Sequence, residues 1–339
     1  MYEATRRTTH GNKELATYLN LLRTAGGNPM TTGNVYVVIP SDDPGYEEFH
    51  KNYNKTYLDG TTMIQPTLTA ANTAITTNRN DVVLLSAYAA HAQTAMLTVA
   101  KNRSHWESLS FRSGIGMGAR TRVTMGVTSA ATDLAVMLNT GVGNTFRGIK
   151  FDSGNTKAES LYAIVEAGEY AIYEGCEFYK STDLNETSAA EVANNGDSAQ
   201  WIDCTFGSLV NIVADDKIRP NMLLTGGIVS GKKCRDNVID GCLFLVKAAG
   251  VEAVRIYGAN ATDVERMLLV KDSVFLSNAL GAATPAHAVG FGAAQTQGSV
   301  VLKGCTSVDH TVMAEASVGI FTSNGAAESF AAGGVSVTT

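Results

Sequence analysis

One six-residue phrase recurs between Phe146 and Ser307, and it constrains the fold of this 339-residue chain more than any other feature. Each copy has an apolar residue, a turn pair and a small residue. A phenylalanine follows two positions later in all but the last copy. The copies are Phe146–Phe151, Tyr173–Phe178, Trp201–Phe206, Ile239–Phe244, Val270–Phe275 and Leu302–Ser307. Their last positions lie 27, 28, 38, 31 and 32 residues apart, a period that indicates stacked repeats.

The spacing inside the phrase predicts where its side chains point. The small residue and the phenylalanine are two apart, so on a strand both face the same side. The residue before the small one is always Gly or Asp, and both types suit a bend between two strands. We therefore expect two interior columns along the stack. The first column is Ile149, Cys176, Cys204, Cys242, Ser273 and Cys305, and the second is Phe151, Phe178, Phe206, Phe244 and Phe275.

The phrase resembles the apolar-x-Asn-Cys-x-Phe turn of right-handed parallel β-helix proteins, the pectin-lyase-like superfamily. The resemblance extends over residues 80–310 and implies an all-β solenoid of about eight coils. The Asn of that turn is Gly or Asp here, so a continuous asparagine ladder is not expected. A leucine-rich-repeat or hexapeptide solenoid is the alternative. The coil length and the absence of a leucine or hexad period favour the β-helix.

Outside the repeat, the sequence predicts short elements at the start of the chain. We expect an amphipathic helix over 12–24, a strand over 35–39, a loop over 41–60 and a helix over 66–77. The first coil strand is expected at 82–85. A helix in front of it would cover the open end of the solenoid, which otherwise invites edge-to-edge pairing.

These elements divide the chain into three parts. Residues 1–62 are expected to be a docking or oligomerisation segment, 63–310 the capping helix and β-helix, and 311–339 a C-terminal cap or subunit contact. The long interval between Phe206 and Phe244 predicts an excursion from the regular coil. Loops on a rigid scaffold often carry function.

Composition limits the classes of partner. Only 17% of residues are charged and the net charge is −6, without a basic stripe, which argues against nucleic acid as a main ligand. The N-terminus has no signal-peptide apolar core, and no apolar run is long enough to span a membrane. We therefore expect synthesis in a host cytoplasm.

The cysteines are expected to be small core residues, and no spacing resembles a metal site, so neither a metal nor a cofactor is expected. Cys234 lies outside the column, beside Lys232, Lys233 and Arg235. Such neighbours would lower the pKa of an exposed thiol, but a functional thiol is not expected there.

The resemblance implies chemistry on acidic sugars by carboxylates, often with calcium, and an Arg or Lys base. The candidates for such a catalytic site are Asp215, Asp216, Arg219 and Asp236, with Lys232 and Arg235 nearby. The other interpretation is a solvated loop whose salt bridges contribute little energy, and we favour it. The sequence therefore predicts no catalytic residues.

For function, the chain resembles the β-helix virion proteins of tailed bacteriophages. The resemblance implies a structural protein of the virion, a capsid decoration (cement) or head-fibre protein. Its partners would be the major capsid protein or other virion proteins, together with further copies of itself, a trimer being one option. The alternatives are a tailspike-like polysaccharide depolymerase and a non-catalytic adhesin that binds a cell-surface glycan.

Overall fold

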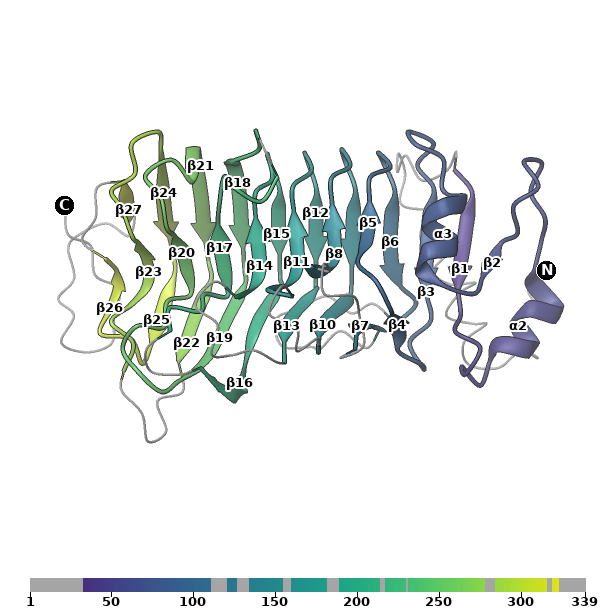
Figure 1. Cartoon of the computed structure of the whole chain (residues 1–339), viewed down its shortest axis with the longest axis horizontal. Helices are drawn as coiled ribbons and strands as arrows, with labels where there is room; N and C mark the ends of the chain where they lie inside the picture. The colour runs from purple at the N-terminus through teal and green to yellow at the C-terminus, as the bar shows by residue number, and fades with distance from the viewer. Residues whose placement is uncertain are drawn as a thin grey trace.

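The computed structural model describes residues 33–110, 121–126, 134–154, 160–181, 189–213, 217–229, 231–277, 284–315 and 319–322. Three parallel sheets run the length of an elongated molecule (Figure 1). Sheet 1 contains, in spatial order, β2 (Ile64–Gln65), β1 (Val35–Val38), β3 (Val82–Leu85), β6 (His105–Ser108), β9 (Thr145–Arg147), β12 (Ile172–Glu174), β15 (Gln200–Ile202), β18 (Cys234–Asp240), β21 (Val264–Lys271), β24 (Gly298–Lys303) and β27 (Ile320–Thr322).

Sheets 2 and 3 have eight strands each. Sheet 2 contains β4 (His91–Gln93), β7 (Thr121–Met125), β10 (Ile149–Ser153), β13 (Glu177–Lys180), β16 (Thr205–Val213), β19 (Leu243–Ala248), β22 (Val274–Ser277) and β25 (Thr306–Val308). Sheet 3 contains β5 (Leu97–Val99), β8 (Ala135–Asn139), β11 (Tyr162–Glu166), β14 (Ala190–Asn194), β17 (Met222–Leu224), β20 (Ile256–Gly258), β23 (His287–Phe291) and β26 (Val312–Ala314).

Each coil takes one strand from each sheet in turn, beginning with β3, β4 and β5 and ending with β24, β25 and β26. The two eight-stranded sheets thus define eight coils, and the chain is a right-handed parallel β-helix, as the sequence predicts.

The repeated phrase forms the corner between sheets 1 and 2. Its Gly or Asp adopts a left-handed conformation in all six copies, with φ between 50° and 64°. Gly suits this region because it has no Cβ, and Asp tolerates it. The predicted bend is therefore confirmed. The small residue behind the bend is buried in all six copies, from Ile149 to Cys305.

The phenylalanines stack on one another inside sheet 2. The ring centroids of Phe206 and Phe244 are 4.6 Å apart with planes at 6°, and those of Phe244 and Phe275 are 4.8 Å apart. A second stack lies inside sheet 1, where Trp201 lies 4.2 Å from Tyr173. Stacked pairs contribute about 0.5–1.5 kcal/mol each beyond their buried area. The interior is therefore aromatic along two adjacent columns.

The N-terminal end departs from the sequence prediction in one place. The expected loop over 41–60 contains a helix, α2 (Tyr46–Tyr53), because Phe49 is buried against a small cluster around β1 and Tyr46 and Tyr53 pack beside it. The helix expected over 66–77 is present as α3 (Leu68–Ala74), where the Thr67 hydroxyl caps the first turn by accepting from the Ala70 amide. The strand expected over 35–39 is confirmed as β1, and it pairs with β3.

The predictions for the two ends of the chain can be compared with the structure only in part. The helix expected over 12–24 lies outside the described residues, as does most of 311–339, although β26 and β27 extend sheets 3 and 1 into that segment. No described helix is long and apolar enough to cross a membrane.

The extra residues between Phe206 and Phe244 occupy two places. β16 shifts register against β19 between Gly207 and Ile212, so sheet 2 bulges there. A longer loop also follows β17, and its Ile228 and Val229 pack on the outer face of sheet 3. The predicted excursion is confirmed, and the bulge forms the wall of the site described next.

Candidate functional site at the corner between sheets 2 and 3

A polar ladder replaces apolar residues in one interior column of the solenoid. Val192, Met222 and Ile256 are register partners in β14, β17 and β20. The residues immediately before them, Glu191, Asn221 and Arg255, are therefore aligned from coil to coil. Flanking members of the same column are small or apolar, including Ala163 and Ala288, and all of these side chains are buried. The polar stretch is thus confined to three coils.

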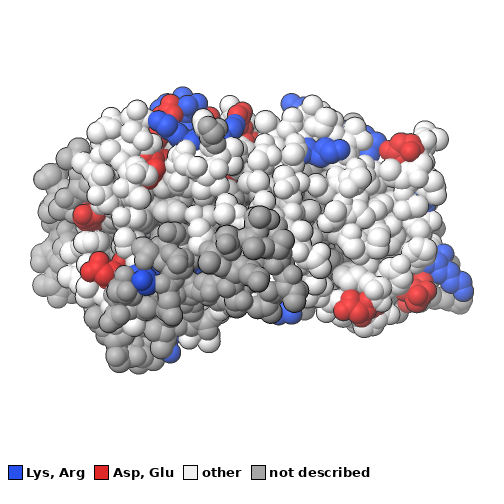
Figure 2. All heavy atoms as spheres, in the orientation of Figure 1, with Lys and Arg blue, Asp and Glu red and all other residues white. Residues whose placement is uncertain are grey.

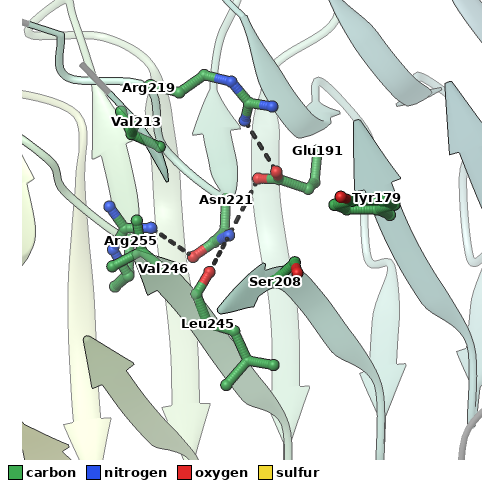
Figure 3. Close-up of a pocket in the computed structure, with 9 residues that line it drawn as sticks. All are labelled: Tyr179, Glu191, Ser208, Val213, Arg219, Asn221, Leu245, Val246 and Arg255. Atoms are coloured by element: carbon green, nitrogen blue, oxygen red, sulfur yellow. Dashed lines mark hydrogen bonds and ion pairs between the residues drawn. The ribbon is translucent and has the colours of Figure 1, made fainter. Parts of the chain in front are cut away.

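Hydrogen bonds connect the three side chains in sequence (Figure 3). The Asn221 Nδ2 group donates to Glu191 Oε2 at 3.0 Å and to the Leu245 carbonyl at 3.0 Å. The Asn221 Oδ1 atom accepts from Arg255 Nη1 at 2.9 Å. Since every polar atom of the Asn221 amide is used, this residue holds the carboxylate on one side and the guanidinium on the other.

A second arginine approaches the carboxylate from the chain segment before β17. Arg219 has φ 35°, directly before Pro220, and its Nη1 group donates to Glu191 Oε1 at 2.9 Å. Its Nη2 group donates to the Lys180 carbonyl at 3.4 Å. Arg219 is 1% exposed, so this is a buried ion pair rather than a surface one.

Gly207 makes room for the ladder. It has φ +80°, and a Cβ at this position would lie 2.2 Å from Asn221 Nδ2 and 2.3 Å from the Leu245 carbonyl oxygen. Only glycine therefore permits the bulge of β16 and the hydrogen bond from Asn221 to Leu245 in the same place.

Among the described residues, the charged side chains that line the site are Glu191, Arg219 and Arg255. Burial lowers the pKa of Arg255 to about 9; Glu191 opposes this effect and the like charge of Arg219 adds to it. Within the described part of the chain, the Nε and Nη2 groups of Arg255 and the Nε group of Arg219 have no hydrogen-bond partner. A cavity of about 10 Å³ adjoins them, lined also by Tyr179, Ser208, Val213, Leu245 and Val246. The site offers buried N–H donors next to a small open space.

The residues singled out from the sequence do not form one site. Asp215 and Asp216 lie outside the described residues. Arg219 belongs to the ladder between β16 and β17, whereas Asp236 lies near the start of β18 in sheet 1 and pairs with Arg266.

The other two basic candidates are engaged near the corner between sheets 3 and 1. Lys232 pairs with Glu169 at 2.6 Å, and Arg235 pairs with Asp197 at 3.2 Å and Glu265 at 2.8 Å.

Charged side chains gather mainly along the upper and lower edges of the face seen in Figure 2, with a largely uncharged band between them where residues are described. Such exposed ion pairs contribute little stability.

Cys234 is buried. Burial raises the pKa of its thiol to about 12, and Asn237 Nδ2 donates to its sulfur at 3.0 Å. The basic neighbours therefore do not activate it. Among the described residues, no group of three or more His, Cys, Asp and Glu side chains is placed to hold a metal ion.

Sequence reasoning missed one carboxyl group on sheet 1. Burial raises the pKa of Glu107 to about 7, while the nearby Arg147 opposes this effect. Arg147 lies 3.3 Å from Glu107 and 2.8 Å from Glu174. A carboxyl group that keeps its proton near neutral pH is suited to general acid chemistry. No sequence signal joins these residues, because strand register alone brings coils 2, 3 and 4 together.

No protein-family model matches the chain, and no curated protein matches its sequence. Among solved structures, the pectin methylesterase of Aspergillus niger shares 10% identity over 86% of this chain and 81% of that chain, with a TM-score of 0.49. The pectate lyase Pel9A shares 11% identity over 86% and 76%, also at 0.49. ORF18 of Geobacillus virus E2 shares 9% over 77% and 57%, at 0.34. Similarity at this level bears on no activity, substrate or partner of this chain.

Proposed function

We propose that the chain is a structural virion protein of a tailed bacteriophage, a capsid decoration or head-fibre protein. The observation that carries the proposal is an apolar ladder on the outer face of sheet 1. Six register partners in successive coils form it: Ile172, Gln200, Val238, Leu269, Val301 and Phe321. Five of the six are apolar, and none is fully buried. The last four members, from Val238 to Phe321, follow one another without a polar residue, and such an apolar strip on a rigid stack is typical of a surface that other proteins cover.

Further copies of this chain are the partner that the ladder fits best. The neighbouring outward column carries both signs of charge, including Glu174, Asp240 and Lys271. A mixed row suits a self-complementary contact better than it suits a strongly charged partner. Residues 1–62 would then dock the oligomer on the capsid shell.

Electron microscopy with antibody against this chain tests the location on particles of the phage that encodes it. Label over the heads is the expected result. Label only at tail tips would favour an adhesin or depolymerase, and unlabelled particles would refute a virion role. A chain truncated to begin at Gly33 keeps β1 paired with β3. It is expected to lose binding to particles, and unchanged binding would remove the docking role from the first 32 residues.

The ladder itself is tested by oligomeric state. Val301→Lys places a charge within the apolar strip and is expected to shift light-scattering mass toward the monomer. Thr306→Lys adds the same charge at an exposed position on sheet 2 and is the matched control. Equal masses for both variants would exclude sheet 1 as the contact face.

The second candidate, a polysaccharide depolymerase, is favoured by one observation: Glu107 is buried beside Arg147 and Glu174, and burial raises its pKa to about 7. It predicts release of reducing ends from host polysaccharide that is lost in Glu107→Gln. Loss instead in alanine variants of Asp215, Asp216 or Asp236 would place the chemistry at the sequence-derived candidates. Binding of polysaccharide without release would indicate an adhesin.

A further inference from the structure

One carboxyl group is fully buried in the corner between sheets 3 and 1. Glu166 is the last residue of β11, and three neighbouring groups donate hydrogen bonds to it. The Gly168 amide donates to Oε1 at 2.6 Å. The Asn139 Nδ2 group and the Tyr173 hydroxyl donate to Oε2 at 2.8 Å and 2.5 Å. All three donors are neutral, so no described cation is hydrogen-bonded to this carboxyl group.

The charge that acts on Glu166 from outside the corner is that of Lys232. Burial raises the pKa of Glu166 to about 7, while its hydrogen bonds and the charge of Lys232 oppose this rise. Lys232 is 32% exposed and already pairs with Glu169 at 2.6 Å. Its charge is therefore shared with a carboxylate at the surface, and it compensates Glu166 only in part.

The other titratable groups of the adjoining elements add no net charge to the corner. Burial raises the pKa of the Tyr173 hydroxyl well above its usual value and that of the Cys234 thiol to about 12, so both stay neutral. Asp197, in the next coil, pairs with Arg235 at 3.2 Å. Glu166 is thus the group of this corner whose charge changes near neutral pH.

The hydrogen bonds allow two states of the carboxyl group. The nitrogen atoms of Asn139 and Gly168 can only donate, whereas the Tyr173 hydroxyl can donate or accept. An ionised Glu166 accepts from all three groups but carries a buried charge. A neutral Glu166 carries no charge, and its proton can be accepted by the Tyr173 oxygen. The donors therefore favour the ionised state and burial favours the neutral one.

The packing leaves one way to relieve the charge. A Cβ at Gly196 would lie 2.8 Å from Glu166 Cγ, so water has no room beside the closed corner. Tyr170, in the same corner, has φ 55°, and its side chain is 61% exposed. A left-handed aromatic residue marks a strained segment that can open locally. We propose that Glu166 and Tyr173 form a pH-sensitive lock, which keeps this corner closed while the carboxyl group holds its proton and opens it to water when the proton is released.

This lock does not depend on the proposed virion role. The Tyr173 ring stacks on Trp201 at 4.2 Å and on Phe146 at 4.9 Å, so the proton also affects the aromatic column of sheet 1. The lock is a conformational switch that loosens coils 3 to 5 as the pH rises.

Hydrogen exchange at the Gly168 amide, measured by NMR on the full chain, tests the lock. The pKa of Glu166 is 4.5 in an open corner and about 7 in the closed one. The opening equilibrium constant should therefore rise about tenfold per pH unit between these values and level off above them. Exchange rates are first corrected for the intrinsic effect of pH on amide exchange. A corrected rate that does not change with pH would overturn the proposal.

A matched pair of variants identifies the titrating group. Glu166→Gln has a neutral side chain of similar size and should lose the additional pH dependence. Glu177→Gln removes a partly exposed carboxylate that lies 3.7 Å from Lys150 on sheet 2, and it should keep the dependence. A pH dependence that survives in Glu166→Gln would refute the assignment to this residue.

Infrared difference spectra detect the proton itself. Burial also raises the pKa of Glu107 to about 7, so the spectra are recorded on a Glu107→Gln chain. The C=O stretch of a neutral carboxyl group should disappear between about pH 5 and pH 9. Absence of this band at the lower pH would show that Glu166 is ionised throughout and would overturn the lock. The exchange measurement on the unsubstituted chain stands even if a variant fails to fold.

Discussion

Replacing Phe206 by alanine should destabilise the solenoid strongly, because this ring is stacked on both sides within its aromatic column. Phe206 is fully buried, and its ring lies between Phe178 at 5.1 Å and Phe244 at 4.6 Å. Backbone hydrogen bonds hold the coils about 4.8 Å apart, so neighbouring rings are poorly able to close the space that is left. A cavity therefore remains in the middle of the stack.

The position in the column sets the magnitude. Truncation of a buried phenylalanine costs about 3–5 kcal/mol, and a site that cannot collapse falls in the upper part of that range. Phe275 lies at the end of the column, with Phe244 at 4.8 Å on one side and Ser307 as register partner on the other. It lacks one stacking contact, worth about 0.5–1.5 kcal/mol. Phe275→Ala should therefore cost less than Phe206→Ala by about that amount.

Denaturant unfolding followed by far-ultraviolet circular dichroism measures both costs, and the fluorescence of Trp201, 5.8 Å from Phe206, reports the same coil locally. Phe321→Ala is the control, because this ring is 57% exposed and its loss should cost less than about 0.5 kcal/mol. If Phe206→Ala cost no more than the control, or less than Phe275→Ala, the stacked column would not be a main source of stability.

Three further outcomes follow from individual residues. Gly207→Ala should cost at least about 2 kcal/mol more than Gly231→Ala in the same unfolding assay, since both have φ near +80° but a Cβ at Gly231 meets nothing within 4 Å. Burial raises the pKa of Glu166 from 4.5 to about 7, so its stabilising effect is full below about pH 4.5 and is lost as the pH rises through 7. The loss is about 3 kcal/mol at 1.36 kcal/mol per pKa unit, and Glu166→Gln should remove it from the stability–pH curve. All five cysteines are buried, so a thiol reagent should label them only as fast as the protein unfolds, and rapid labelling of the native protein would contradict the packing.

The repeated corner of the solenoid could be predicted from the sequence because the residues that form it are close together in the chain. The bend, the small residue and the phenylalanine lie within six residues, and each is fixed by chemistry that acts at that range: left-handed backbone at Gly175, a small buried side chain at Cys176 and a stacked ring at Phe178. Repetition then places like residues beside each other without further information. α2 was missed for the opposite reason: its one buried residue, Phe49, stands among polar neighbours and contacts a cluster from other parts of the chain.

The buried polar ladders could not be predicted from the sequence, because they depend on the register between coils. Glu191, Asn221 and Arg255 differ in type, lie 30 and 34 residues apart and belong to no repeated phrase. The same holds for a short ladder at the end of sheet 3. There Asn139, Glu166 and Asn194 are aligned, and each accepts from the backbone amide two residues later. The sequence prediction concerned only the repeated corner, where Gly and Asp stand in place of Asn.

The interval lengths nevertheless pointed to the place where the interior becomes polar. The step from Phe206 to Phe244 is 38 residues, and part of its surplus leaves the ladder at the register shift that follows Gly207. The surplus residues cannot enter the regular ladder of β16 and β19, so they leave it as a bulge between Gly207 and Ile212. The bulge opens the corner where Arg219 enters and where Asn221 reaches across to Leu245. In a solenoid held together by identical contacts from coil to coil, a coil of unequal length has to satisfy its own backbone and charges. The long interval between Phe206 and Phe244 and the polar ladder therefore belong to the same irregular coil.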